Sequence, residues 1–185
     1  QALADDNPWR RSTAQRVLLE RNDRGARDLL ARLIQTEGVA PSGVIRALQT
    51  LKSLKSLESS DVMVALNHEN YGVRVHGLRL AEQWLDSDET LRSRLITMSQ
   101  DPDPRVRLQL AMTLGESKDT WSVEPLRDLA ERHGGDRWMA TALLSSANNR
   151  NGGRLLLALL GSIKLGSGAR ALVEPLAKTV GGRRD

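Results

Sequence analysis

The feature that most constrains the fold is an internal repeat with a period of about 30 residues, which lies in the range of helix-pair repeat units. Aligning the 185-residue chain on one recurring position, most often arginine, gives six anchors at nearly constant spacing: Arg11, Val44, Arg74, Arg107, Arg137 and Arg170. The residues three and seven positions after each anchor are small or apolar, which is the spacing of one face of an α-helix. A helix that recurs in this way is typical of helix-pair repeats, which bury their apolar faces by stacking.

Shorter apolar patterns between the anchors predict one partner helix for each gap. They are Leu29, Leu30, Leu33 and Ile34; Val62, Met63 and Leu66; Leu91, Leu95 and Ile96; Val123, Leu126 and Leu129; and Leu155, Leu156, Leu159 and Leu160. Composition agrees, since the chain has 31 leucines and no phenylalanine, which favours helices over sheets. We therefore expect an all-α fold of about eleven antiparallel helices, in a single repeat domain over residues 1–185.

The turn at residues 101–107, with the sequence Asp-Pro-Asp-Pro-Arg-Val-Arg, precedes a helix that contains Ala111 and Leu114. This segment resembles the HEAT-repeat family, and residues 72–74 and 80–82 repeat a shorter form of the pattern. The resemblance implies a right-handed α-α superhelix, a solenoid of the HEAT or armadillo type. It also implies that the anchored helices form one wall and their partners the other, with the concave wall as the working surface.

Residues 9–21, 106–116 and 143–146 also resemble the HEAT-like segment of large secreted bacterial proteins. In those proteins a sugar-dehydrogenase-like propeller precedes the repeats and a c-type cytochrome domain often follows. The resemblance implies a scaffold or protein-interaction module whose partner is another protein or the neighbouring domains of a larger, extracytoplasmic, haem-binding bacterial protein. Because the chain begins with Gln1, we interpret it as a fragment of such a protein. No redox chemistry carries over, since the chain has neither propeller strands nor a CxxCH motif.

No set of residues predicts catalysis, a metal site or a cofactor. The chain has no cysteine, which excludes thiol nucleophiles and zinc ribbons, and its three histidines (His68, His76 and His133) lack the spacing that brings ligands together on a helix. The longest apolar run, residues 155–160, is far shorter than the roughly 20 residues that cross a bilayer. We therefore expect a non-enzymatic segment without membrane insertion.

The in-phase arginines have two interpretations, because residues in phase line up from repeat to repeat in a stack. The first is a structural ladder, in which each guanidinium pairs with an Asp or a carbonyl of a neighbouring repeat. The second is a row of charges that faces an anionic partner. We favour the ladder, because Asn and Asp side chains suited to helix N-caps keep the same phase. The predicted ladder residues are Arg11, Arg74, Arg107, Arg137, Arg170, Asn7, Asn70, Asp101 and Asp103.

The alternative function is nucleic-acid binding by a basic N-terminal cluster. Its residues are Trp9, Arg10, Arg11, Arg16, Arg21, Arg24 and Arg27. The formal net charge is +4 over residues 1–57 but −3 over residues 58–100, so the sequence shows no continuous basic stripe of the kind that many nucleic-acid binders carry, although folding can bring distant basic blocks together. The four tryptophans (Trp9, Trp84, Trp121 and Trp138) fall at different phases of the predicted repeat, and we expect each to fill a gap between helices or an end of the solenoid.

Overall fold

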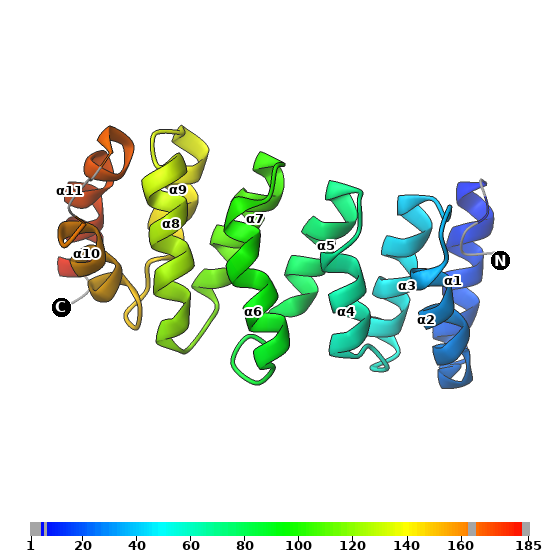
Figure 1. The fold of residues 1–185 in the computed structure, drawn as a ribbon. Coiled ribbons are helices and arrows are strands. Elements are labelled where there is room, and N and C mark those ends of the chain that lie inside the picture. Colours follow the sequence, from blue (N-terminus) through cyan, green and yellow to red (C-terminus); the bar gives the residue numbers. More distant parts are fainter. Residues whose placement is uncertain (1–4, 6, 163–165, 183–185) are drawn as a thin grey trace. The chain divides into compact units, whose positions relative to one another are not determined.

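The computed structural model describes residues 5, 7–162 and 166–182, and every regular element in these ranges is helical (Figure 1). Eleven α-helices and three short 3-10 turns follow one another in the described ranges, and no strand occurs among them. Each of the six anchored helices and each of the five partner helices predicted from the repeat is present. The predicted all-α class is therefore confirmed.

The contacts divide the chain into two compact units, residues 1–80 and 81–185. Unit 1 contains α1 (Pro8–Glu20), α2 (Arg27–Gln35), α3 (Pro41–Ser53), α4 (Ser59–Leu66) and nearly all of α5 (Tyr71–Ala81). Within it α2 packs against α3, α1 packs beside α3, and α2 packs beside α4. A helix thus contacts both its neighbour in the chain and the next helix but one, which is the pattern of two-layer helical repeats.

Unit 2 contains α6 (Glu89–Thr97), α7 (Pro104–Gly115), α8 (Val123–His133), α9 (Arg137–Ser146), α10 (Gly152–Leu160) and α11 (Ser167–Gly181). Its anchored helices pack beside one another, α7 with α9 and α9 with α11, and its partner helices do the same, α6 with α8 and α8 with α10. The pairs α8 with α9 and α10 with α11 join the two layers. This is the same arrangement as in unit 1, with aliphatic side chains such as Leu95, Leu110 and Leu126 fully buried between the layers.

The helix N-caps show that one of the six predicted anchors, Arg137, is misplaced. The N-cap residues of α7 and α9 are Asp103 and Asp136, and counting from each cap shows that the position equivalent to Arg107 is Ala140 in α9. Arg137 is the first residue of α9, so the alignment on arginine places this anchor three positions too early. The shifted alignment places Leu143 and Ala147 at the apolar positions, and both are buried. The alignment on arginine fails here because this repeat has no arginine at the anchor.

Polar side chains bridge adjacent repeats of unit 2 at a spacing of 31 residues. The Thr113 hydroxyl donates to Glu82 at 3.0 Å, and the Ser117 hydroxyl donates to Asp86 at 2.7 Å. Burial alone would raise the pKa of Asp86, but hydrogen bonds from Ser117 and from the backbone N–H groups of Lys118 and residue 119 outweigh it and lower that pKa below its usual value. These carboxylates therefore hold the stack together.

Candidate interaction site

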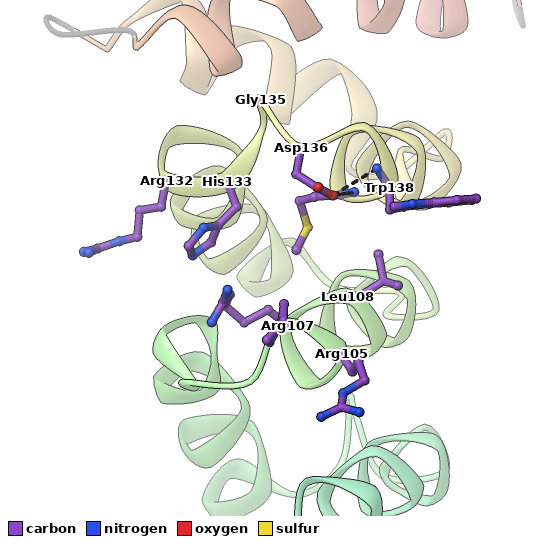
Figure 2. A pocket seen from close by; sticks show the side chains of 10 residues that line it. Arg105, Arg107, Leu108, Arg132, His133, Gly135, Asp136 and Trp138 are labelled. Carbon is purple, nitrogen blue, oxygen red and sulfur yellow. Dashed lines mark hydrogen bonds between the residues drawn. The ribbon is translucent and has the colours of Figure 1, made fainter.

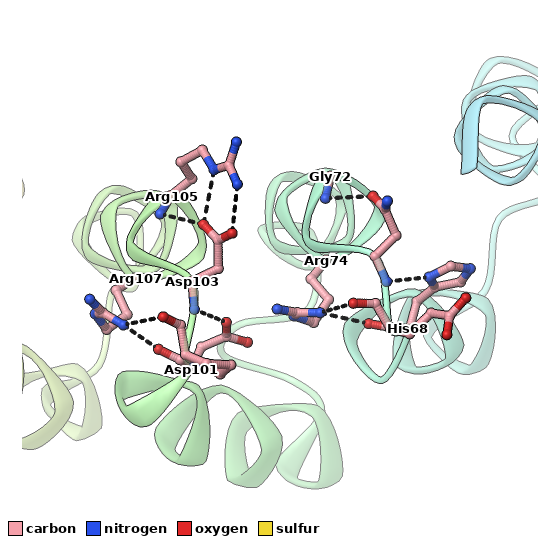
Figure 3. A network of polar contacts seen from close by, with 10 residues as sticks. His68, Gly72, Arg74, Asp101, Asp103, Arg105 and Arg107 are labelled. Carbon is pink, nitrogen blue, oxygen red and sulfur yellow. Dashed lines mark hydrogen bonds and ion pairs between the residues drawn. The ribbon is translucent and has the colours of Figure 1, made fainter. Parts of the chain in front are cut away.

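The turn before α5 combines a helix cap with an anchored arginine. The backbone N–H of Gly72 donates to the Asn70 side chain at 2.9 Å, which satisfies a free donor of the first helical turn. Arg74, only 8% exposed, donates from Nη1 to the carbonyls of His68 and Glu69 at 2.9 and 2.6 Å (Figure 3). The arginine thereby fixes the loop that leads into its own helix.

The turn before α7 repeats this construction (Figure 3). The backbone N–H of Arg105 donates to Asp103 at 2.9 Å, and the backbone N–H of Asp103 donates to Asp101 at 3.0 Å. Arg107 donates from Nη1 to the carbonyls of Asp101 and Pro102. In the turn before α1, Asn7 is the N-cap in the same way. Arg11, the anchor of α1, donates from Nη1 to the carbonyl of Asp5 at 2.6 Å.

The hydrogen bonds of Arg11, Arg74 and Arg107 to loop carbonyls lie within single repeats. The ladder between repeats that the sequence indicates stays a prediction. Arg137 does not occupy the anchor, and its guanidinium instead lies 5.7 Å from the ring centre of Trp138. Arg170 is exposed, and residues 164 and 165, which correspond in sequence to the loop carbonyls, lie outside the described residues.

Part of the predicted N-terminal cluster forms an exposed basic surface on α1 and the turn after it. Arg10, Arg16 and Arg21 are exposed there. Arg10 lies 3.3 Å from the Asp5 carboxylate, and Arg16 lies 3.6 Å from the carboxylate of the next helical turn. The side chain of Arg24 lies outside the part of the chain that the structure describes. The positive charge of this surface is therefore partly balanced by acidic neighbours.

Arg27 is instead part of the packing between α2 and α4. Its Nη2 atom lies 2.8 Å from Glu58 and 3.1 Å from Asp61, which is only 2% exposed. Asp61 also accepts a hydrogen bond from the backbone N–H of Glu58 at 3.0 Å. The Arg27 guanidinium holds the pKa of Glu58 below its usual value. These contacts favour a structural role for Arg27 over contact with nucleic acid.

Two of the four tryptophans are exposed, so the prediction that each fills a gap between helices or an end of the solenoid is wrong for Trp9 and Trp138. Trp9 and Trp138 are 71% and 68% exposed, whereas Trp84 and Trp121 are half-buried. With the corrected alignment Trp9 and Trp138 share one position, two residues after the N-cap of their helix. At about 100° per residue this position lies off the buried face, so the indole is left at the surface.

A pocket of about 460 Å³ lies among the N-terminal ends of α7 and α9 and the C-terminal end of α8 (Figure 2). Leu108 and Met139 supply apolar lining from α7 and α9. Arg107 and His133 point into the space between α7 and α8, and Trp138 lies at the opposite side (Figure 2). The pocket is thus apolar in its lining and has cationic and aromatic groups around it.

Two of the three arginines of the pocket are neutralised by carboxylates. Arg105 lies 2.8 Å from Asp103, and Arg132 lies 2.5 Å from Asp128. Arg107 differs, because its hydrogen bonds within the described residues run from Nη1 to carbonyl groups, while its Nε is buried without a partner. The positive charge of Arg107 is therefore not balanced by an ion pair in the part of the chain described.

His133 lies beside this charge. Burial lowers the pKa of His133 below its ordinary value, and the positive charge of Arg107 adds to the shift. The negative charges of Asp128 and Asp136 raise the pKa of His133, and the positive charge of Arg132 lowers it further. At neutral pH the imidazole is consequently mainly uncharged, and an anion bound in the pocket would favour its protonated form.

Asp136 contributes less negative charge to the pocket than its side chain suggests. Its carboxylate accepts hydrogen bonds from the backbone N–H groups of Trp138 and Met139 at 3.0 and 2.9 Å, at the start of α9. A carboxylate in this position interacts favourably with the helix dipole. The charge is therefore offset by the helix that it caps.

Sequence reasoning identified Arg107 but missed the rest of the pocket. Arg132, His133 and Trp138 come from two further helices. Because the fifth anchor was misaligned, the sequence did not show that Trp138 and Trp9 have the same position in their repeats. The N-cap residues were the better alignment signal, because Asn7, Asp103 and Asp136 are in phase. Aligned on them, the two exposed tryptophans are recognisable from the sequence.

Other kinds of site have less support in the described residues. No group of three or more His, Asp or Glu side chains is placed to hold a metal ion within those ranges. No helix in the same ranges is both long enough and apolar enough to span a membrane. A larger surface hollow of about 890 Å³ near the loop between α2 and α3 lacks arginine and lysine in its lining. The α7–α9 pocket is therefore the strongest candidate site.

The comparisons with known proteins agree with the repeat architecture. A search of curated proteins finds no match to the chain. Residues 60–147, from α4 through α9, match the family model described as HEAT repeats. HEAT repeats usually mediate protein interactions and typically have no enzymatic activity. Over residues 60–147 the chain is thus similar to HEAT repeats, and the pairing of its helices is that of an α-solenoid.

Proposed function

We propose that the chain is a non-enzymatic scaffold or protein-interaction module of the HEAT-like type, a single repeat domain over residues 1–185. The observation that carries the proposal is the pairing of a HEAT-repeat match with an exposed pocket at the helix ends of that same segment. Stacked repeats present residues from several helices to one partner, as Arg107, His133 and Trp138 illustrate.

The proposed setting is a larger multidomain bacterial protein of the membrane-bound dehydrogenase or haem-binding type. Support for this setting comes from the sequence resemblance of residues 9–21, 106–116 and 143–146. In such a protein the module would bind either a separate protein or a neighbouring domain of its own chain. The extracytoplasmic location belongs to the same proposal.

Affinity capture with the full 185-residue chain tests the proposed function. Three baits are compared. The first is unmodified, and the second, the pocket variant, carries Arg132→Gln and Trp138→Ala at exposed pocket positions. The third carries Arg154→Gln on α10 and is the matched control. We expect one protein to be retained at equal levels by the unmodified and control baits and to be depleted about ten-fold by the pocket variant, since exposed Trp and Arg side chains commonly dominate interface energies. Identical retention by all three baits would argue against the pocket as the binding surface.

The alternative function is nucleic-acid binding, and the exposure of Trp9 beside Arg10 and Arg21 favours it. An exposed indole stacks on unpaired bases, and arginine binds phosphate. The ion pair of Arg27 with Glu58 and Asp61 removes one member of the predicted cluster from this role. A labelled duplex, included in the titration below, distinguishes this function from protein binding.

A further inference from the structure

The α7–α9 pocket has the chemistry of a peptide site, an inference that rests on the proposed protein-interaction function. Its volume of about 460 Å³ lies within the roughly 300 to 1,000 Å³ of ligand-binding pockets. Leu108 and Met139 offer contacts to an apolar side chain, and the exposed indole of Trp138 extends this surface. One aliphatic or aromatic side chain of a partner fits a site of this size and lining.

The positive charge of Arg107 indicates that the ligand also carries a negatively charged group next to its apolar side chain. Within the described residues the hydrogen bonds of Arg107 use Nη1 and end on neutral carbonyl groups, so Nη2 is the atom that we assign to a ligand. Carboxylates form the strongest hydrogen bonds with such a group. Arg105 and Arg132 lie at the edge of the pocket, each already paired with an aspartate of this chain.

We propose that the pocket binds an acidic peptide segment of a partner protein, in which one apolar side chain inserts between Leu108 and Met139 and an adjacent carboxylate pairs with Arg107. The complementarity is one of charge and polarity, because the pocket places a cation without an ion-pair partner in the described residues beside an apolar cavity. This assigns a ligand class and a position to the interaction module.

Fluorescence anisotropy tests this assignment with two labelled heptapeptides blocked at both ends. One has a central Phe flanked by Asp and Glu, and the other has Asn and Gln in place of the acids. We expect the acidic peptide to bind at least about ten-fold more tightly, because only its carboxylates form charge-assisted hydrogen bonds with Arg107. Equal affinity of the two peptides, or binding of neither, would overturn the proposal.

Substitutions separate the pocket from general charge attraction. Arg107→Gln is expected to weaken binding of the acidic peptide about ten-fold, while Arg107→Lys retains part of it. Because Arg107 also holds its own loop, Trp138→Ala serves as a second variant at an exposed position and is expected to weaken binding about three-fold. Arg154→Gln, with the same charge change on α10, leaves the affinity unchanged; equal losses in the three variants would contradict a local site.

The pKa of His133 distinguishes binding in the pocket from nonspecific binding, which leaves this pKa unchanged. The charged groups that face it are Arg107 on α7, Asp128 and Arg132 on its own helix, and Asp136 before α9. A carboxylate bound at Arg107 favours the imidazolium, so saturation with the acidic peptide is expected to raise the pKa of His133 measured by NMR. Peptide affinity then rises as the pH falls through the pKa of the imidazole in the complex, and it is unaffected by pH well above that value. An unchanged His133 pKa at saturation would place the peptide elsewhere and overturn the assignment.

Two further probes distinguish other ligands. Sodium phosphate that displaces the peptide completely at millimolar concentration, together with equal affinity of the peptides, would indicate a simple anion site. A labelled DNA duplex that binds more tightly than the acidic peptide and shows strong salt dependence would favour the nucleic-acid function. Either result overturns the peptide assignment, whereas a protein captured through the pocket without acidic-peptide binding leaves the interaction function in place.

Discussion

Replacing Arg27 by methionine is expected to lower the free energy of unfolding by about 3 kcal/mol, because the buried carboxylate of Asp61 loses its cation. Methionine retains much of the apolar volume of the side chain, so the effect reports mainly the charge. Urea unfolding monitored by circular dichroism at pH 7 measures it.

A matched control is Arg16→Met on α1. Arg16 also has an acidic partner, Glu20, but both side chains are more than 60% exposed, and a surface pair of this kind contributes at most about 1 kcal/mol. The double variant Arg27→Met with Asp61→Asn is expected to recover part of the loss, since it removes the unpaired charge. Equal destabilisation by the Arg27 and Arg16 substitutions would contradict a structural role for the Arg27 pair.

The second large effect is expected at Gly115, where α7 meets α9. A Cβ atom at this position would lie 2.8 Å from both the Cα and the Cβ of Ser146, too close for either helix to remain in place. Gly115→Ala should therefore cost about 2 kcal/mol through overpacking. A decrease in Tm of roughly 4 to 8 °C follows for a chain of this size.

Gly153 in α10 provides the control for this substitution. Apart from its chain neighbours and the backbone of its own helix, no described atom lies within 4 Å of a Cβ at this position, and alanine favours helix over glycine by about 1 kcal/mol. Gly153→Ala is therefore expected to leave Tm unchanged or raise it slightly. A Gly115→Ala variant with unchanged Tm would show that the α7–α9 contact is looser than described, since Ser146 there also donates to the Ala111 carbonyl at 2.6 Å.

Much of the fold is predictable because each repeat needs the same apolar spacing. The six anchored helices and their partners follow from a period of about 30 residues, since no single helix pair buries its own apolar face. The exact alignment was harder to predict. Arginine at the anchor is optional, as Val44 and Ala140 show, whereas an Asn or Asp N-cap satisfies free backbone donors at four of the six starts.

The contacts between repeats were less visible in the sequence because each interface uses different residues. Thr113 pairs with Glu82, whereas Ser162 pairs with Glu131, both at a separation of 31 residues. The spacing of residues along one helix does not show which side chain the next repeat supplies to Glu82. Packing between repeats, not local pattern, determines these pairs.

The candidate site was predictable only in part, for a related reason. Arg107 has a recurring position, so the sequence identifies it. His133 ends one helix and Trp138 begins the next, and their convergence with Arg107 depends on how three helix ends pack. A pocket of this kind arises from the repeat architecture but has no repeated motif of its own.

The proposed function requires that a partner protein binds at the pocket formed by the ends of α7, α8 and α9. The most direct measurement is photo-crosslinking in the cells from which the chain comes, with a photoreactive amino acid at position 138 and, as control, at the exposed position 154. We expect one dominant protein adduct from position 138 that is absent from position 154 and is lost when Arg107 is replaced by glutamine. Adducts of equal yield at both positions, or none at position 138, would contradict it.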